Sequence, residues 1–98
     1  MAHILIVDDE EDIRLLLKYN LEKEGHIVSC ASNGKEALQM VAHQKPELIL
    51  LDVMMPIMDG IEVCEELKSD PVNRDIIICF LTARSEDYSQ IARLKAGG

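Results

Sequence analysis

The sequence predicts an α/β fold in which helices cover both faces of a parallel sheet. Short apolar runs alternate with segments of helical periodicity, and the runs carry no polar face, which is typical of buried parallel strands. Turn residues separate the two kinds of segment. The chain has 98 residues, 48% hydrophobic and 29% charged, so we expect one globular domain over residues 1–98.

Two strand–helix units fill the first half of the chain. Residues 4–7 form an apolar strand pattern, and apolar positions then recur at helical spacing: Ile13, Leu16, Leu17 and Leu21. Gly25 is expected to cap this helix. Residues 27–31 form a weaker, half-polar strand suited to a sheet edge. Asn33-Gly34 opens a second helix, which Pro46 prevents from continuing.

Two further units fill the second half. Residues 48–51 form the third strand, and a loop over residues 53–59 follows it. Residues 59–62 have the spacing of a capping box and open the third helix. Residues 76–81 form a fourth, wholly apolar strand, and a last helix pattern starts at Ser85.

Polar side chains follow three of the four strands: Asp8 and Asp9, Asp52, and Thr82. In a flavodoxin-like, doubly wound sheet of order 2-1-3-4, the first and third strands are neighbours, so the three carboxylates are expected to meet at the switch point. Clustered carboxylates repel unless one is protonated or a cation neutralises them. With no His or Cys in the set, the oxygens favour Mg²⁺ or Mn²⁺. One carboxylate can then act as nucleophile and form an acyl phosphate.

The composition excludes several other classes. The net charge is -8, which disfavours direct nucleic-acid binding by this segment. No secretory signal and no apolar run of membrane-spanning length is visible, so a cytoplasmic location without membrane binding is expected. The three cysteines form no C-x-x-C pair and are expected to be buried thiols.

Three stretches resemble the receiver domains of two-component response regulators, and the resemblance runs along the whole chain. They are Ile4–Glu10, Leu50–Pro56 with Met58–Gly60, and Leu81–Arg84. The resemblance implies that the chain is a phosphoacceptor switch in signal transduction, phosphorylated by a histidine kinase and not itself a turnover enzyme. It implies that Asp52 is the phosphoacceptor.

The resemblance also implies roles for the neighbouring residues. Asp9 and Asp52 would bind the metal directly, Asp8 mainly through water, and Met54 through its backbone carbonyl. Thr82 would donate a hydrogen bond to the phosphoryl group and act as the switch, and Ala83 would leave room for the phosphate. The residue types are similar to those of regulators that carry a DNA-binding output domain.

The family pattern continues past residue 98 with a fifth strand, which supplies a lysine, and a fifth helix. Lys95 lies in the fourth helix pattern and is not taken as a substitute for that lysine. The apolar fourth strand would be an unprotected edge here, which favours a chain that continues. The alternative is a truncated chain that completes its sheet with another copy, and such a chain is expected to be a homo-oligomer.

Two other functions remain open at this level. A binding-only pseudo-receiver would hold metal without reacting. A Mg²⁺-dependent phosphohydrolase also uses an aspartyl phosphate, but it needs an acidic residue two positions after the nucleophile, where this chain has Met54.

Overall fold

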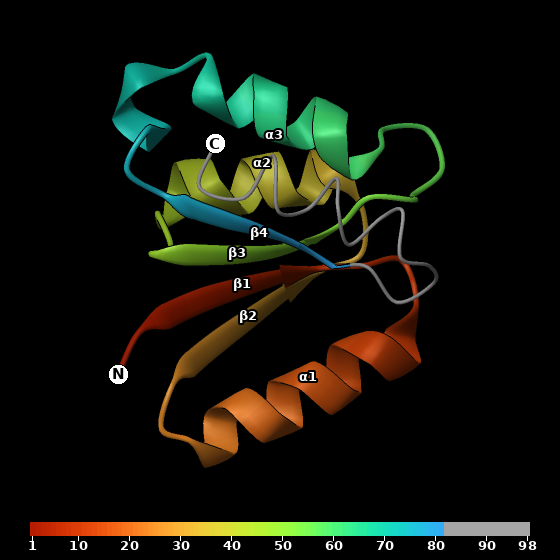
Figure 1. Cartoon of the computed structure of the whole chain (residues 1–98), viewed down its shortest axis with the longest axis vertical. Coiled ribbons are helices and arrows are strands. Elements are labelled where there is room, and N and C mark those ends of the chain that lie inside the picture. Colours follow the sequence, from red (N-terminus) through yellow and green to blue (C-terminus); the bar gives the residue numbers. More distant parts are fainter. Residues whose placement is uncertain (82–98) are drawn as a thin grey trace.

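Residues 1–81 are described by a computed structural model and form a parallel sheet with helices on both faces (Figure 1). The strands are β1 (His3–Val7), β2 (Ile27–Ala31), β3 (Leu48–Asp52) and β4 (Ile77–Leu81). The helices are α1 (Glu11–Lys23), α2 (Gly34–His43) and α3 (Gly60–Lys68), with a 3-10 helix η1 (Pro71–Asn73) before β4. The helix predicted from Ser85 lies outside the described residues.

The four strands lie in the order β2-β1-β3-β4, and each neighbouring pair is parallel, as the sequence predicts. Residues 4–7 of β1 are at most 2% exposed, because β1 is flanked by strands on both sides and covered on both faces. Strand β2 lies at one edge and is half-buried, which confirms the interpretation of its polar pattern. Val7 pairs with Leu51, so β1 and β3 end side by side.

Helices α2 and α3 cover one face of the sheet, and α1 lies on the other (Figure 1). The main core lies under α2 and α3. Its sheet residues are Leu5, Val7, Ala31, Ile49, Leu51, Ile78 and Phe80, and its helix residues include Ala37, Val41, Val63 and Leu67. Each large side chain buried there contributes about 1.5–3 kcal/mol relative to an exposed one, so this layer holds the strands in register.

The face of the sheet under α1 is less completely covered than the face under α2 and α3. Helix α1 packs on β1 and β2 and buries none of its own residues, and Leu16, which the periodicity placed on its apolar face, is 58% exposed. Ile77 is in register with Leu48 and Ile4 on this same face, and it is 57% exposed. Within residues 1–81, β4 is therefore a sheet edge that is open on the α1 side. The exposed Cys79 lies there too, so the expectation of buried thiols is wrong for this cysteine.

The helix ends follow the local sequence signals. Asn33 caps α2, and its side-chain oxygen accepts the Glu36 N–H at 2.8 Å. Helix α1 ends at a C-cap formed by Glu24, and Gly25 is the next residue, with φ of 94°. That left-handed conformation is the one that glycine adopts beyond a cap, so Gly25 follows the cap and the helix ends one residue earlier than predicted. No helix within residues 1–81 is long and apolar enough to span a membrane.

Candidate functional site

Asp8 directly follows β1 and is fixed there by backbone contacts. It is 5% exposed, and its Oδ1 accepts the Glu10 N–H at 2.8 Å. Its own N–H donates to the carbonyl of Ala31 on β2 at 3.2 Å, and its carbonyl accepts a hydrogen bond from the Arg14 guanidinium at 2.8 Å. Burial raises the pKa of the Asp8 carboxyl, and the Glu10 N–H opposes that rise. The start of the loop from β1 to α1 is therefore anchored twice, to β2 through Ala31 and to α1 through Arg14.

Three consecutive acidic residues of this loop can place one oxygen each within 4.8 Å of the others: Asp8, Asp9 and Glu10. Asp9 and Glu10 are exposed. Asp8 and Asp9 are candidates from the sequence, whereas Glu10 is not, and the structure has Glu10 as the N-cap residue of α1. A third acidic residue directly after a strand was the signal that could have added Glu10 to the candidate set.

Asp52 is the last residue of β3, and the pairing of β1 with β3 brings it beside the Asp8–Asp9 loop. Its Oδ1 accepts the Met54 N–H at 3.1 Å. Burial, followed by the negative charge of Asp8, raises the pKa of Asp52 to about 6, and Asp9 acts in the same direction. The Met54 N–H partly opposes this rise. A carboxylate in this position is costly to ionise unless positive charge is brought to it.

The loop from β3 to α3 returns to Asp52 at its far end. The Gly60 N–H donates to the carbonyl of Val53 at 2.9 Å, and the Gly60 α-carbon packs against the backbone carbonyl of Asp52. The predicted capping box is present: Asp59 accepts the Glu62 N–H at 2.9 Å, and the Glu62 carboxylate accepts the Asp59 N–H at 3.1 Å. Both ends of the loop are thus held against the strand that carries Asp52.

The structure brings together three of the residues selected from the sequence: Asp8, Asp9 and Asp52. Met54 also lies at the site, through its N–H, while its carbonyl as a metal ligand stays a prediction. Thr82 and Ala83 lie outside the described residues. Leu81, which precedes them, pairs with Asp52 across β3 and β4.

The donor set fits a hard divalent cation. Asp8, Asp9 and Glu10 offer carboxylate oxygens within 4.8 Å of one another, and Asp52 adds a carboxylate beside Asp8 and Asp9. Mg²⁺ and Mn²⁺ prefer such oxygen ligands. Burial and the crowded carboxylates of Asp8 and Asp9 raise the pKa of Asp52, and a divalent cation would offset this negative charge.

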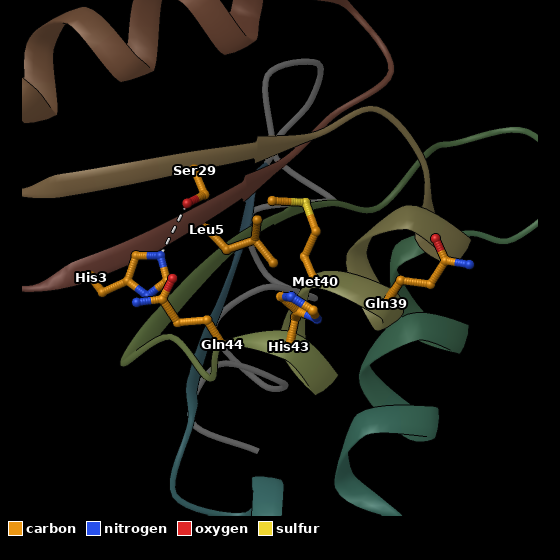
Figure 2. Close-up of a pocket in the computed structure, with 7 residues that line it drawn as sticks. All are labelled: His3, Leu5, Ser29, Gln39, Met40, His43 and Gln44. Atoms are coloured by element: carbon orange, nitrogen blue, oxygen red, sulfur yellow. Dashed lines mark hydrogen bonds between the residues drawn. The ribbon is translucent and has the colours of Figure 1, made fainter.

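A cavity of about 320 Å³ lies at the other end of the sheet (Figure 2). It is lined by His3, Leu5, Ser29, Gln39, Met40, His43 and Gln44. His3 begins β1, whereas Asp8 follows its end, so five residues of extended strand, roughly 16 Å, separate them. Figure 2 shows the His3 ring directed at the Ser29 hydroxyl, 3.1 Å away. This cavity is not part of the carboxylate site.

The fold and the carboxylate site together define a class of signalling protein. The family model of the response regulator receiver domain matches residues 4–98, and the chain belongs to this family. It is a receiver domain of two-component signal transduction.

Named relatives and solved structures agree with this assignment. The chain is 48% identical over 94 residues to the alkaline phosphatase synthesis transcriptional regulatory protein PhoP of Bacillus subtilis, covering 96% of this chain and 38% of that protein. It is 43% identical over 96 residues to the response regulator MprA of Mycolicibacterium vanbaalenii, covering 98% and 41%. The chain thus spans about two fifths of the length of the curated relatives that it matches.

Among solved structures, the response regulator TrrA of Thermotoga maritima, in complex with Mg²⁺-BeF, is similar with a TM-score of 0.84 and 40% identity, covering 98% of this chain and 82% of that one. The N-terminal domain of a response regulator receiver protein from Methanoculleus marisnigri has a TM-score of 0.86 and 35% identity, covering 97% and 79%.

Proposed function

We propose that this domain accepts a phosphoryl group on Asp52 from the phosphohistidine of a histidine kinase, with Mg²⁺ bound beside it. One observation carries the proposal: Asp52 ends β3 next to two further carboxylates, and this crowding and burial raise its pKa to about 6. A carboxylate that only serves as solvated surface would have neither this burial nor these acidic neighbours. The complex of TrrA with Mg²⁺-BeF shows that a related receiver holds this ion, which supports the same ion here.

In the proposed transfer, a carboxylate oxygen of Asp52 forms a bond to phosphorus while the phosphorus–nitrogen bond of the phosphohistidine breaks. The electron pair of that bond stays on the imidazole nitrogen of the kinase. The Met54 N–H orients the attacking carboxylate through Oδ1. Asp52 must be ionised to attack, so its raised pKa opposes the reaction until positive charge is present.

The metal would be held by Asp9 and Asp52 directly, by Asp8 mainly through water, and by the Met54 carbonyl. Bound there, Mg²⁺ supplies the positive charge that offsets the carboxylates and the phosphoryl oxygens. Thr82 would donate a hydrogen bond to the phosphoryl group, and Ala83 would leave space for it.

The domain works, in this proposal, as a switch and not as a turnover enzyme. Its partners are a histidine kinase and an output domain of the whole regulator. The names of the relatives, a transcriptional regulatory protein among them, support a DNA-binding output, with no nucleic acid bound by the receiver itself. The net charge of -8 supports a receiver that binds no nucleic acid, because the phosphates would be repelled.

Incubation with acetyl phosphate and Mg²⁺, followed by intact-mass measurement, tests the proposal. We expect one added phosphoryl group on the wild-type chain and none on Asp52→Asn. Asp75→Asn is the matched control, because Asp75 lies just before β4, at the end of the sheet away from Asp52, and pairs with Lys45. Equal labelling of Asp52→Asn and the wild type would exclude Asp52 as the acceptor.

Metal-binding and phosphomonoester-turnover measurements beside this experiment separate the alternatives. Metal binding without any phosphoryl incorporation would identify a binding-only pseudo-receiver. Steady turnover of a phosphomonoester would identify a phosphohydrolase, although the Met54 side chain, 46% exposed, offers no proton for a leaving group.

A further inference from the structure

Ile57 has an unusual backbone for its residue type. It lies in the loop between β3 and α3 (green in Figure 1), and its φ is 71°. Among residues 1–81 it is the one non-glycine residue with positive φ. The left-handed conformation places Cβ close to the carbonyl oxygen, and a β-branched residue suffers most from that contact. The folded state therefore carries local strain at Ile57.

No packing of the side chain offsets this strain, because Ile57 is fully exposed. Its neighbours Met54 and Pro56 are exposed as well, and Met54 is 46% exposed. These three residues, the loop crest, present apolar side chains to solvent. Neither the strained backbone nor the exposed apolar side chain stabilises the isolated domain. This combination favours a role for Ile57 in contact with another molecule.

The loop crest is held in a defined place beside Asp52. Met54 donates its N–H to Asp52 Oδ1 at 3.1 Å. At the other end of the loop, Gly60 packs on the Asp52 carbonyl. Pro56 and Met58 flank Ile57, and the Met58 N–H donates to the Pro56 carbonyl at 2.7 Å. The backbone at Ile57 is therefore set by its surroundings, in a loop whose two ends both lie against Asp52.

We propose that Ile57 is an apolar docking residue for the protein that donates the phosphoryl group. This inference rests on the proposed function, since a donor that brings phosphorus to Asp52 must cover the rim around it. On the β1 side, this rim is formed by exposed acidic residues: Asp9, Glu10, Glu11 and Asp12. On the β3 side it is the loop crest. The donor surface that fits both sides has an apolar patch beside its phosphohistidine and a basic region next to that patch.

A small donor has no such surface, and this difference provides the test. Acetyl phosphate is small enough to reach Asp52 without covering the loop crest, whereas in this proposal a kinase domain contacts the crest when it covers Asp52. Two variants remove the apolar side chain and tolerate the left-handed backbone: Ile57→Asn and Ile57→Gly. Ile57→Val is the matched control, because it keeps an apolar, β-branched side chain.

Each variant is labelled by acetyl phosphate with Mg²⁺ and, separately, by a histidine kinase that has been autophosphorylated with ATP and selected for transfer to the wild-type chain. For Ile57→Asn and Ile57→Gly we expect the KM for kinase transfer to rise about tenfold, as for a moderate interface residue, with kcat and acetyl phosphate labelling unchanged. Ile57→Val stays within about twofold. The melting temperatures of the first two variants should rise by a few degrees as strain is released, so damage to the fold cannot explain slower transfer.

The outcomes separate the inference from the function beneath it. Unchanged kinase KM in both Ile57→Asn and Ile57→Gly would overturn the docking role and leave the proposed function in place. Failure of acetyl phosphate to label even the wild type would overturn the proposed function, and the docking role with it. A homodimer in sedimentation that depends on Ile57, with unchanged kinase transfer, would assign the loop crest to a second copy of this chain and overturn the kinase assignment.

Discussion

The α-carbon of Gly60 lies against the backbone carbonyl of Asp52, and a Cβ at position 60 would collide with that carbonyl and with Val53. This contact connects the first residue of α3 to the strand end that carries the candidate acceptor. Because both collision partners are backbone atoms, no side-chain rotation can relieve them.

Gly60→Ala should therefore destabilise the domain by about 2–3 kcal/mol in urea unfolding. Gly25→Ala is the control: its φ is 94°, but nothing lies within 4 Å of an added Cβ, so only backbone strain of about 1 kcal/mol is expected. The account of the Gly60 contact fails if the two substitutions cost the same.

Asp52 should make stability depend on pH in a defined direction. Its pKa is about 6 in the folded chain, against an ordinary value of 3.8, so the folded state binds more protons than the unfolded state between these values. The contribution of Asp52 to stability is thus present below about pH 4 and is lost as the pH rises through about 6. Without added metal, Asp52→Asn should be more stable than the wild type at pH 7, by about 1–3 kcal/mol after allowance for partial solvent screening.

Urea unfolding at about pH 4 and pH 7 measures this difference, which should be much smaller at the lower pH. Asp75→Asn is a control whose effect on stability should have the opposite sign, because the hydrogen bond from Lys45 lowers the pKa of Asp75. A stability gain from Asp52→Asn that is equal at both pH values would contradict the raised pKa.

Magnesium should stabilise the wild-type domain by binding the folded state alone. At a concentration of about 100 Kd, this linkage is worth about 2.7 kcal/mol, and a chelator should reverse it. Asp9→Asn should lose most of the shift in melting temperature, since it removes a proposed direct ligand at an exposed position. Asp75→Asn should keep the full shift. An identical Mg²⁺ response in Asp9→Asn and the wild type would remove Asp9 from the ligand set.

The capping box of α3 should contribute measurably to the stability of the domain and to the local order of the first turn of α3. Asp59→Ala removes the acceptor for the Glu62 N–H and should cost about 1 kcal/mol. Hydrogen exchange should speed up first in the opening turn of α3. Asn33→Ala removes the matching cap of α2 and should cost a similar amount without affecting the turn at Gly60. Faster exchange at Gly60 in both variants would show that the effect is global.

Much of the fold followed from local signals. The apolar runs became β1, β3 and β4, because segments with no polar face must be covered on both sides or lie at a partly covered edge. The capping box at Asp59 and the end of α1 near Gly25 were also visible in sequence, since each depends only on neighbouring residues. Burial on the α1 side was less predictable. The periodicity of Leu16 indicates a helix face, but whether that face is covered depends on what packs against it.

The sequence by itself determined the residue types of the candidate site, because Asp8 and Asp52 each follow an apolar strand and all such strands in a parallel sheet end at one edge. Only the tertiary structure decided their chemistry. The β1–β3 register brings Asp52 beside Asp8, and this juxtaposition, together with burial, raises the pKa of Asp52. Tertiary structure also decided the left-handed backbone of Ile57, a residue type that predicts the opposite, because contacts at both ends of its loop fix the path between them.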